Sequence, residues 1–323
     1  MQAVTIDDKQ LYWKPRERPA IAANEVLIKV AYAGINRADL MQAAGQYPPP
    51  SGVTDIPGLE VSGEIVECGA EVNGWQAGEK VCALLAGGGY ADYVAVPACQ
   101  VAPIPTGLSV QQAAAICEVY ATAWMNIFML AAAQPGERVL VHAGASGVGS
   151  AAIQLCRRQG NPCFVTVGSD EKLDYCLALG AEAGWNRRQG EFVEAVKQWG
   201  GVDVILDPVA GAYLYQDQQV LNQDGRIVVI GLMAGRDSQL DAGRLLMKRQ
   251  HLLGSTLRSQ PSQRKGAVIQ QLINEVWPGF SDSKQPLSAQ VDQVFERDQV
   301  RDAHAYLAAN RNHGKVLLAI NPD

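Results

Sequence analysis

A glycine-rich turn between an apolar strand and a helix is the part of this chain whose spacing most clearly implies chemistry. Apolar residues 139–141 lead into a turn with glycines at 144, 147 and 149, and small residues follow from Ser150. In a parallel sheet, this arrangement presents backbone N–H groups and a helix N-terminus to a dinucleotide pyrophosphate. The spacing is Gly-x-x-Gly-x-Gly, so a strand-to-helix turn without a ligand stays open. The expected cofactor contacts are Gly144, Ala145, Ser146, Gly147, Val148 and Gly149.

The second predicted strand, residues 163–167, bears on which nicotinamide cofactor binds. NAD-binding units end this strand with an acid that binds the ribose 2′-hydroxyl. Here the strand ends in Gly168 and Ser169, and acids follow only one and two residues later. Serine, lysine and arginine side chains suit a 2′-phosphate, so we expect NADPH rather than NADH. The expected phosphate contacts are Gly168, Ser169, Lys172 and Arg187, with Arg188 beside them; solvated surface charges are the alternative for the basic residues.

Composition limits the classes of partner. Of the 323 residues, 48% are hydrophobic and 19% charged, which suits a folded chain of about two domains. The 33 acids and 27 bases give a net charge of −6 with no basic block, so we expect neither nucleic acid nor membrane as partner. Seven cysteines and four histidines are scattered, which disfavours disulfides and metal sites. An acidic N-terminus without an apolar leader predicts a cytoplasmic location.

The order of predicted elements indicates an α/β fold with two domains. Residues 1–115 contain short strands separated by glycine and proline, which predicts a β-rich, partly barrel-like domain. Strands alternate with helices over residues 116–284, which predicts βαβ units and a doubly wound parallel sheet. The tail, 285–323, is too short to fold alone. We therefore expect it to return to the first domain.

Several motifs together resemble those of a known family. They are Asn36-Arg-Ala-Asp-Leu-Met-Gln42, Gly45-Gln-Tyr47-Pro-Pro, Ala83-Leu-Leu-Ala-Gly-Gly-Gly89, the turn at 142–149, Gly231-Leu-Met233 and Gly254-Ser-Thr-Leu-Arg258. The chain resembles zinc-free medium-chain dehydrogenases/reductases of the zeta-crystallin-like quinone oxidoreductase family, above all the tumour-suppressor-inducible branch. The resemblance implies a GroES-like catalytic domain, an inserted Rossmann domain and NADPH in the cleft between them. It also implies a homodimer that pairs the last Rossmann strands, residues 251–257.

The same resemblance implies further site residues. It places Asn36 and Tyr47 in the catalytic pocket, where amide and phenol would contact a quinone oxygen or the nicotinamide ribose. Helix capping by Asn36 and packing of Tyr47 on its prolines are the alternatives. The implied nicotinamide-side contacts are Thr122, Ser255, Thr256 and Leu257. Gly231, Leu232 and Met233 end the fifth strand at the carboxyl edge of the sheet, where the cofactor is expected, with an ordinary strand-to-loop turn as the alternative. For Thr122 the alternative is a residue that packs a helix.

Two departures from related families affect the chemistry. Zinc-dependent members carry cysteine at the position of Asn36 and Gly-His-Glu where this chain has Gly58-Leu59-Glu60. The resemblance therefore implies that no catalytic zinc is bound. The quinone reductases usually place Asn-Tyr after the third strand, whereas this chain has Asn186-Arg187, so arginine is expected to contact the phosphate instead.

A zinc-free site suits some hydride acceptors and not others. Alcohol oxidation must stabilise an alkoxide, which a Lewis acid does well. A quinone or an enone instead gives a delocalised anion, so positioning in a dry pocket is sufficient. We expect NADPH-dependent reduction of quinones, with electrons passing from nicotinamide C4 to a conjugated acceptor in a zinc-free interdomain cleft. Reduction of α,β-unsaturated carbonyls is the nearer alternative, and a cofactor-binding protein without turnover is the other.

Overall fold

The computed structural model describes residues 1–322 and divides the chain into two compact units. Unit 1 comprises residues 1–121 together with the segment from 257 onward, and unit 2 comprises residues 122–256. Unit 1 is β-rich and unit 2 holds a parallel sheet, which confirms the expected α/β fold class. The boundaries differ from those expected, because residues 116–121 and 257–284 lie in unit 1 rather than with the parallel sheet.

The helices after residue 257 attach to the β-rich unit through particular contacts. The thiol of Cys99 donates to the carbonyl of Ser262 at 3.5 Å, at the start of helix α9. The indole of Trp277 donates to the carbonyl of Pro103 at 2.9 Å. These contacts join segments far apart in sequence, so helical periodicity alone could not show which sheet the helices cover. The elements concerned are η1 (Ala98–Gln100), β7 (Val101–Pro103), α9 (Ser262–Gln271), η4 (Leu272–Val276) and η5 (Trp277–Ser281).

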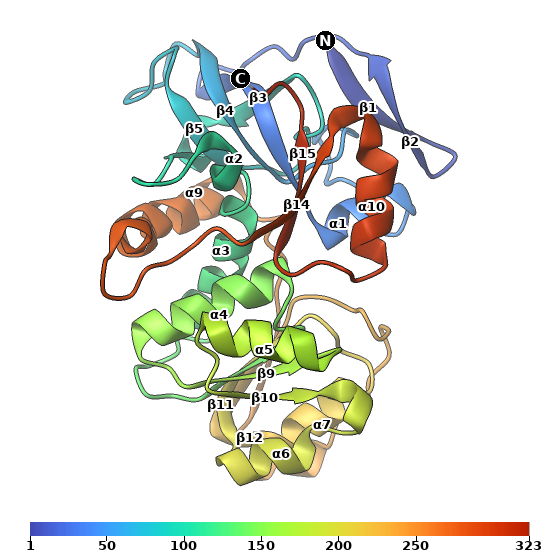
Figure 1. Ribbon diagram of the computed structural model, residues 1–323, viewed down its shortest axis with the longest axis vertical. Coiled ribbons are helices and arrows are strands. Elements are labelled where there is room, and N and C mark those ends of the chain that lie inside the picture. Colours follow the sequence, from blue (N-terminus) through green and yellow to red (C-terminus); the bar gives the residue numbers. More distant parts are fainter. Residues whose placement is uncertain (323) are drawn as a thin grey trace. The chain divides into compact units, whose positions relative to one another are not determined.

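Unit 1 is organised around one long strand, β3 (Glu25–Ile35) (Figure 1). Its first half pairs with β6 and its second half with β15, while β4 runs along its other edge. The order is β14-β15-β3-β4-β5-β7, so the C-terminal tail returns to the first domain as expected. The other strands are β1 (Gln2–Asp7), β2 (Gln10–Pro15), β4 (Glu60–Cys68), β5 (Lys80–Leu84), β6 (Tyr93–Pro97), β14 (Val291–Glu296) and β15 (Lys315–Ala319).

Two helices of unit 1 bear on its polar interior. Helix α1 (Arg37–Ala43) begins directly after β3, with Asn36 as its N-cap. Helix α10 (Val300–Ala308) follows η6 (Arg297–Gln299) and precedes β15. The core beneath them is made of valine, isoleucine and alanine side chains from β3, β4, β5 and β15, with Val300 and Ala303 of α10. This apolar layer holds the ends of β3, β4 and β15, which carry the polar side chains described below.

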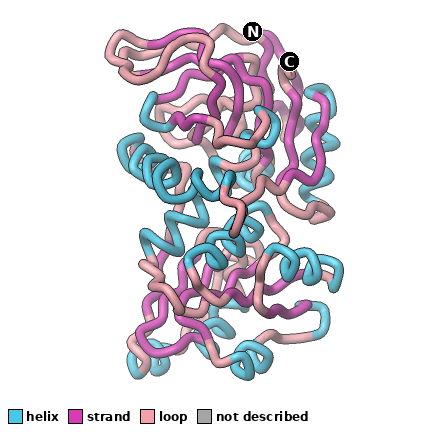
Figure 2. The backbone as a smooth tube through the Cα atoms, turned by 60° about the vertical axis from the view of Figure 1, so that its left-hand side comes forward, coloured by secondary structure: helices cyan, strands magenta, loops and turns pink. Residues whose placement is uncertain are grey.

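Unit 2 is a six-stranded parallel sheet with the order β10-β9-β8-β11-β12-β13. Helices α4 and α5 lie on one face and α6 and α7 on the other, so the central strands are apolar on both sides (Figures 1 and 2). The strands are β8 (Val139–His142), β9 (Cys163–Val167), β10 (Ala183–Asn186), β11 (Val202–Asp207), β12 (Leu221–Val229) and β13 (His251–Gly254). The helices are α4 (Gly147–Gln159), α5 (Asp170–Leu179), α6 (Val193–Trp199), α7 (Tyr213–Val220) and α8 (Ala242–Met247), with η3 (Arg187–Gln189) after β10.

An apolar helical run covers residues 110–130. It consists of α2 (Val110–Ala113), α3 (Cys117–Trp124) and the wider turns of η2 (Met125–Leu130). By length and composition it is the one helix of the described chain that could cross a membrane. Its most apolar window is 83% buried within the protein, which is typical of a core helix. Glu118 is its only charged residue.

Candidate functional site

The glycine turn after β8 packs as a dinucleotide-binding turn does. A Cβ on Gly149 would fall far inside van der Waals contact with the carbonyl oxygens of Ala143 and Gly144, and one on Gly144 would lie 2.8 Å from Val165 Cβ. These two positions therefore require glycine for close packing. Ser146 caps α4, accepting the Gly149 N–H at 3.1 Å, and the first-turn N–H groups of Gly147 and Val148 are directed outward from the helix end. The turn thus fits the pyrophosphate of a dinucleotide.

The ends of β9 and β10 bring two of the predicted phosphate contacts, Gly168 and Arg187, together. A Cβ on Gly168 would lie 3.6 Å from Nε and Nη2 of Arg187, so the guanidinium lies over the backbone of Gly168. Ser169 begins α5 as its N-cap, and its hydroxyl accepts from the backbone N–H of Lys172 at 3.3 Å. The carboxylate of Asp170 accepts from Asn186 at 2.9 Å. Arg187, rather than Arg188, is therefore the arginine at the end of β9.

The remaining predicted residues of unit 2 lie at the same edge of the sheet. Gly231 follows β12, and a Cβ there would lie 2.7 Å from the carbonyl oxygen of Pro208 after β11. Leu232 and Met233 are half exposed beside it. Ser255 extends β13 by donating its N–H to the carbonyl of Val229 at 3.0 Å, and Thr256 follows at the end of the unit. Thr122 is the buried first residue of unit 2, whereas Leu257 begins the second segment of unit 1.

Unit 1 contains a buried ion pair at the start of α1. The Lys315 ammonium lies 2.7 Å from Oε1 of Glu60, 2.8 Å from Oδ1 of Asn36 and 2.7 Å from the carbonyl oxygen of Ile35. All three of its protons are thereby used. The amide of Asn36 also donates to Oε1 of Glu60 at 3.2 Å, and Oε2 of Glu60 accepts the N–H of Glu118 at 3.0 Å. The Asn36 side chain thus orders this network, while its role toward a substrate stays a prediction.

Tyr47 lies on an arginine that sequence reasoning missed. The guanidinium of Arg258 is 5.3 Å from the Tyr47 ring and donates to the Tyr47 carbonyl at 3.3 Å. It also donates to Ala86 O at 2.7 Å and to Oε1 of Gln42 at 2.6 Å. Arg258 therefore fixes the backbone and the ring of Tyr47, while a contact of the phenol with a ligand stays a prediction. Burial raises the pKa of Tyr47, so the phenol hydrogen-bonds as a neutral group.

A second buried carboxyl, Asp39, ties α1 to the sheet. It accepts from the Asn36 N–H at 2.8 Å, the Gly58 N–H at 3.0 Å and the Tyr90 hydroxyl at 3.1 Å. Burial raises the pKa of Asp39 to about 6, although these hydrogen bonds act against it. The hydroxyl of Tyr90 also meets His304 at 3.2 Å. Asp39 thus holds Asn36 and the Gly58 turn in place.

Glu118 is the other buried acid of unit 1 that sequence reasoning missed. Burial, and after it the Glu60 carboxylate, raise the pKa of Glu118 to about 8. Its Oε2 is enclosed and has no hydrogen-bond partner among the described residues. A single acid within the apolar run 110–130 was the available signal, because an isolated buried carboxyl is costly and seldom incidental.

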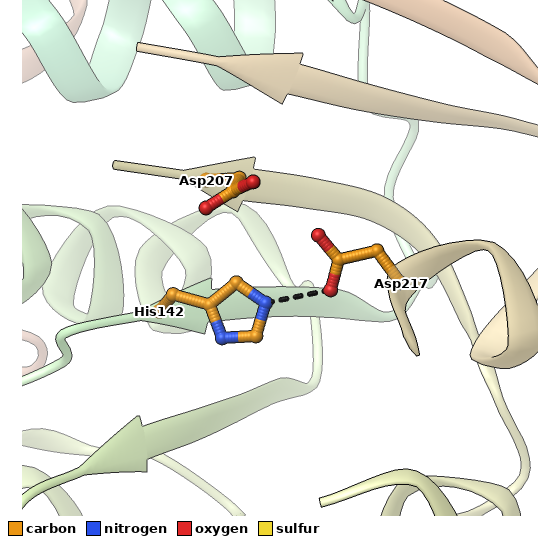
Figure 3. A group of neighbouring side chains, drawn as sticks. All are labelled: His142, Asp207 and Asp217. Carbon is orange, nitrogen blue, oxygen red and sulfur yellow. Dashed lines mark hydrogen bonds and ion pairs between the residues drawn. The ribbon is translucent and has the colours of Figure 1, made fainter. Parts of the chain in front are cut away.

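Unit 2 holds a comparable cluster, shown in Figure 3. Nε2 of His142 lies 2.8 Å from Oδ1 of Asp217, and its Nδ1 lies 2.8 Å from the Thr166 hydroxyl. The Asp207 carboxylate accepts from the N–H groups of Val209 at 2.7 Å and Ala210 at 2.9 Å. Three residues, His142, Asp207 and Asp217, each have one atom that could bind a metal ion, and these three atoms lie within 4.8 Å of one another. His142 is enclosed and hydrogen-bonded at both nitrogens, as expected for a core histidine.

The donor set of unit 1 does not fit a catalytic zinc ion. Both oxygens of Glu60 are occupied, by Lys315 and Asn36 on one side and by a backbone N–H on the other. Asn36 and Leu59 offer neither thiolate nor imidazole. The described structure contains no cluster of cysteine and histidine ligands either, and all seven cysteines are free. An ammonium group supplies the positive charge beside Glu60.

Comparisons with known proteins agree with this architecture. Residues 22–106 match the alcohol dehydrogenase GroES-like domain, and residues 147–274 match the zinc-binding dehydrogenase family. Quinone oxidoreductase-like protein 2 of Bos taurus is 30% identical over 304 residues, covering 93% of this chain and 86% of the relative. The quinone oxidoreductase of Thermus thermophilus, also solved with NADPH, is 30% identical with a TM-score of 0.82, covering 99% of this chain and 100% of the other. CurK enoyl reductase is 29% identical with a TM-score of 0.85, covering 98% of each chain.

The two units are therefore those of a nucleotide-dependent dehydrogenase, with a GroES-like unit and a Rossmann unit. The chain belongs to the medium-chain dehydrogenase/reductase superfamily, among its quinone oxidoreductase-like, NAD(P)H-binding members. Because the matching relatives include both quinone and enoyl reductases, membership establishes an oxidoreductase and leaves the acceptor to be proposed.

Proposed function

We propose that the protein is an NADPH-dependent quinone reductase that works without zinc, similar to the tumour-suppressor-inducible branch of its family. One observation carries this proposal, the network of Asn36, Lys315 and Glu60. In it the Lys315 ammonium pairs with the Glu60 carboxylate, which a catalytic metal would need as a ligand. Such a site cannot stabilise a localised alkoxide as a Lewis acid does, but it suffices for an acceptor whose negative charge is delocalised.

The residues of unit 2 have separate tasks in binding. The turn 144–149 receives the pyrophosphate, and Arg187 with Ser169 receives the 2′-phosphate of the adenosine ribose. Bound nicotinamide supplies a hydride. In unit 1, Tyr47 and the polar network orient the acceptor. A homodimer through β13, an edge strand whose Leu252 is exposed, stays a prediction.

Cofactor choice is tested by titrating NADPH and NADH into the parent and into Arg187→Ala. Charge-assisted contacts to a phosphate are worth about 1.5–3 kcal/mol, so NADPH affinity should fall by roughly 10- to 100-fold while NADH affinity is unchanged. Arg188→Ala is the matched control, because Arg188 is also exposed but is not the arginine over Gly168. If Arg187→Ala binds NADPH as tightly as the parent, the phosphate assignment is wrong.

Reduction of α,β-unsaturated carbonyls is the second candidate, favoured by the likeness to CurK enoyl reductase over 98% of the chain. An enone accepts hydride at carbon and leaves an enolate, which makes the same modest demand on the site. Steady-state rates with a planar aromatic dione and with a simple alkenal, both under NADPH, separate the two. Faster turnover of the alkenal would favour the second candidate over the first.

A further inference from the structure

The charged groups in the interior of unit 1 do not balance locally. Glu60 and Glu118 lie together, yet the Lys315 ammonium makes its ion pair with Glu60 only, at 2.7 Å. With its three protons used, Lys315 has none left for a second carboxylate. Two carboxylates that share one cation in a buried site cannot both stay ionised at low cost. The proton therefore resides on Glu118, which lacks the donors that stabilise Glu60.

The surroundings of Glu118 come from several elements of unit 1. Glu60 and Asp39 raise the pKa of its carboxyl, while Lys315 and Lys265 lower it. The charged and titratable groups that face it are Glu60 on β4, Lys315 on β15, Asp39 on α1, Lys265 on α9, and Tyr47 and Arg258 in the adjoining loops. Burial acts in the same direction as the two acids and outweighs the cations. Near neutral pH the group is thus a neutral acid with a proton to give.

Of the polar groups in this interior, Glu118 has a carboxyl oxygen whose bonding capacity is unused among the described residues. The side chains of Glu60, Lys315 and Asn36 bond to one another, whereas Oε2 of Glu118 has no partner in the part of the chain described. The Glu118 residue as a whole is 9% exposed, compared with 0% for Glu60 and 3% for Lys315, while its Oε2 is enclosed. A buried carboxyl without a partner is costly, and an acceptor oxygen would satisfy it.

We propose that Glu118 is a catalytic residue that contacts the carbonyl oxygen of the acceptor and donates the proton that completes its reduction. The inference rests on the proposed quinone reductase function. The acceptor gains two electrons as hydride from dihydronicotinamide, which is thereby oxidised. The quinone with the hydride is a hydroquinone anion, and the O–H bond of Glu118 breaks as the O–H bond at the anionic oxygen forms. The Glu118 carboxylate then regains a proton from water. Tyr47 is the weaker acid and only hydrogen-bonds, because burial raises the pKa of its phenol.

The test compares the parent with Glu118→Gln, which keeps the size of the side chain but has no acidic proton. General-acid catalysis contributes about 10²- to 10⁴-fold, so kcat with a quinone should fall by that factor. NADPH affinity should not change. In the parent, kcat/KM should fall as the pH rises through about 8, because the protonated acid is the active form, and the variant should lose this decline. Glu118→Asp should restore the decline with a lower kcat.

An infrared pH titration gives a readout that is independent of turnover. The parent should show a protonated carboxyl band that disappears near pH 8, and Glu118→Gln should lack it. Glu71→Gln, an exposed glutamate of the same unit, is the control and should resemble the parent in every measurement. If the parent reduces quinones and Glu118→Gln does so equally fast with the same pH profile, the proton-donor role is wrong and the proposed function stands. If the parent reduces no quinone with NADPH, both are wrong.

Discussion

Each unit encloses a cluster of acids, but the clusters differ in how their charges are satisfied. In unit 1, Glu60 is paired with Lys315 and Glu118 has an oxygen without a partner. In unit 2, His142 bonds to Asp217, whose second oxygen faces Asp207 (Figure 3). That second oxygen is also enclosed without a hydrogen-bond partner among the described residues, and burial raises the pKa of Asp217 to about 6.

The difference separates a group that stabilises the fold from one for which we propose a chemical role. His142 lies under aromatic rings, 4.9 Å from those of Phe192 and Tyr213, and both of its nitrogens are bonded. It joins β8 to α7 and has no bonding capacity left for a substrate. Glu118 has an unused oxygen, although burying an acid is costly. Asp217 also has an unsatisfied oxygen, but its other oxygen bonds to His142, so what distinguishes Glu118 among the described residues of the two clusters is a carboxyl with no side-chain partner.

Lys315→Met should show the largest effect, because it leaves the Glu60 carboxylate enclosed without its cation. Breaking a buried pair by removing one partner typically costs about 3–5 kcal/mol, so the free energy of unfolding should fall by that amount. Urea unfolding followed by circular dichroism measures it. The double variant Lys315→Met/Glu60→Gln removes both charges and should recover most of the loss. Equal losses in the single and double variants would show that the pair is not what stabilises this interior.

The sequence predicted the local features of the site better than its long-range pairs. The turn 144–149 was predictable because strand, glycines and helix follow one another directly. The Lys315–Asn36 contact joins residues 279 positions apart, and a lysine that begins a strand resembles a surface residue until the strand order is known. Glu118 was visible as the only charge in an apolar run, yet the charged groups that most affect its pKa lie on β4 and β15.

The division into two units also depends on contacts between segments distant in sequence. Helix α9 carries its buried side chains on one face, and periodicity shows that face without showing what covers it. Contacts such as that of Trp277 with Pro103 place the following turn in unit 1. Tertiary packing therefore decided an assignment that the alternation of strands and helices had left to the other unit.

Asp217→Asn should alter the pH dependence of stability, an effect of intermediate size. Burial lowers the pKa of His142 but Asp217 outweighs it, so the pKa values of both partners are raised in the native state. Groups with raised pKa values stabilise the fold at low pH and lose that contribution as the pH rises through the native pKa. The unfolding free energy of the parent should thus decline from about pH 4 to 7 more steeply than that of the variant, by roughly 1–3 kcal/mol over this range. Urea midpoints at several pH values measure the difference, and parallel profiles would contradict it.

The exposed ion pair between Arg249 and Asp224 should give the smallest effect, which makes it the reference for both buried clusters. Nη2 of Arg249 lies 2.6 Å from Oδ2 of Asp224, as short as any buried contact described above, but both side chains are more than half exposed. Water and salt screen such a pair, so Arg249→Gln should leave the urea midpoint unchanged within error, above all at high ionic strength. A loss comparable to that of Lys315→Met would mean that short distance, rather than burial, governs how much a charge pair contributes in this protein.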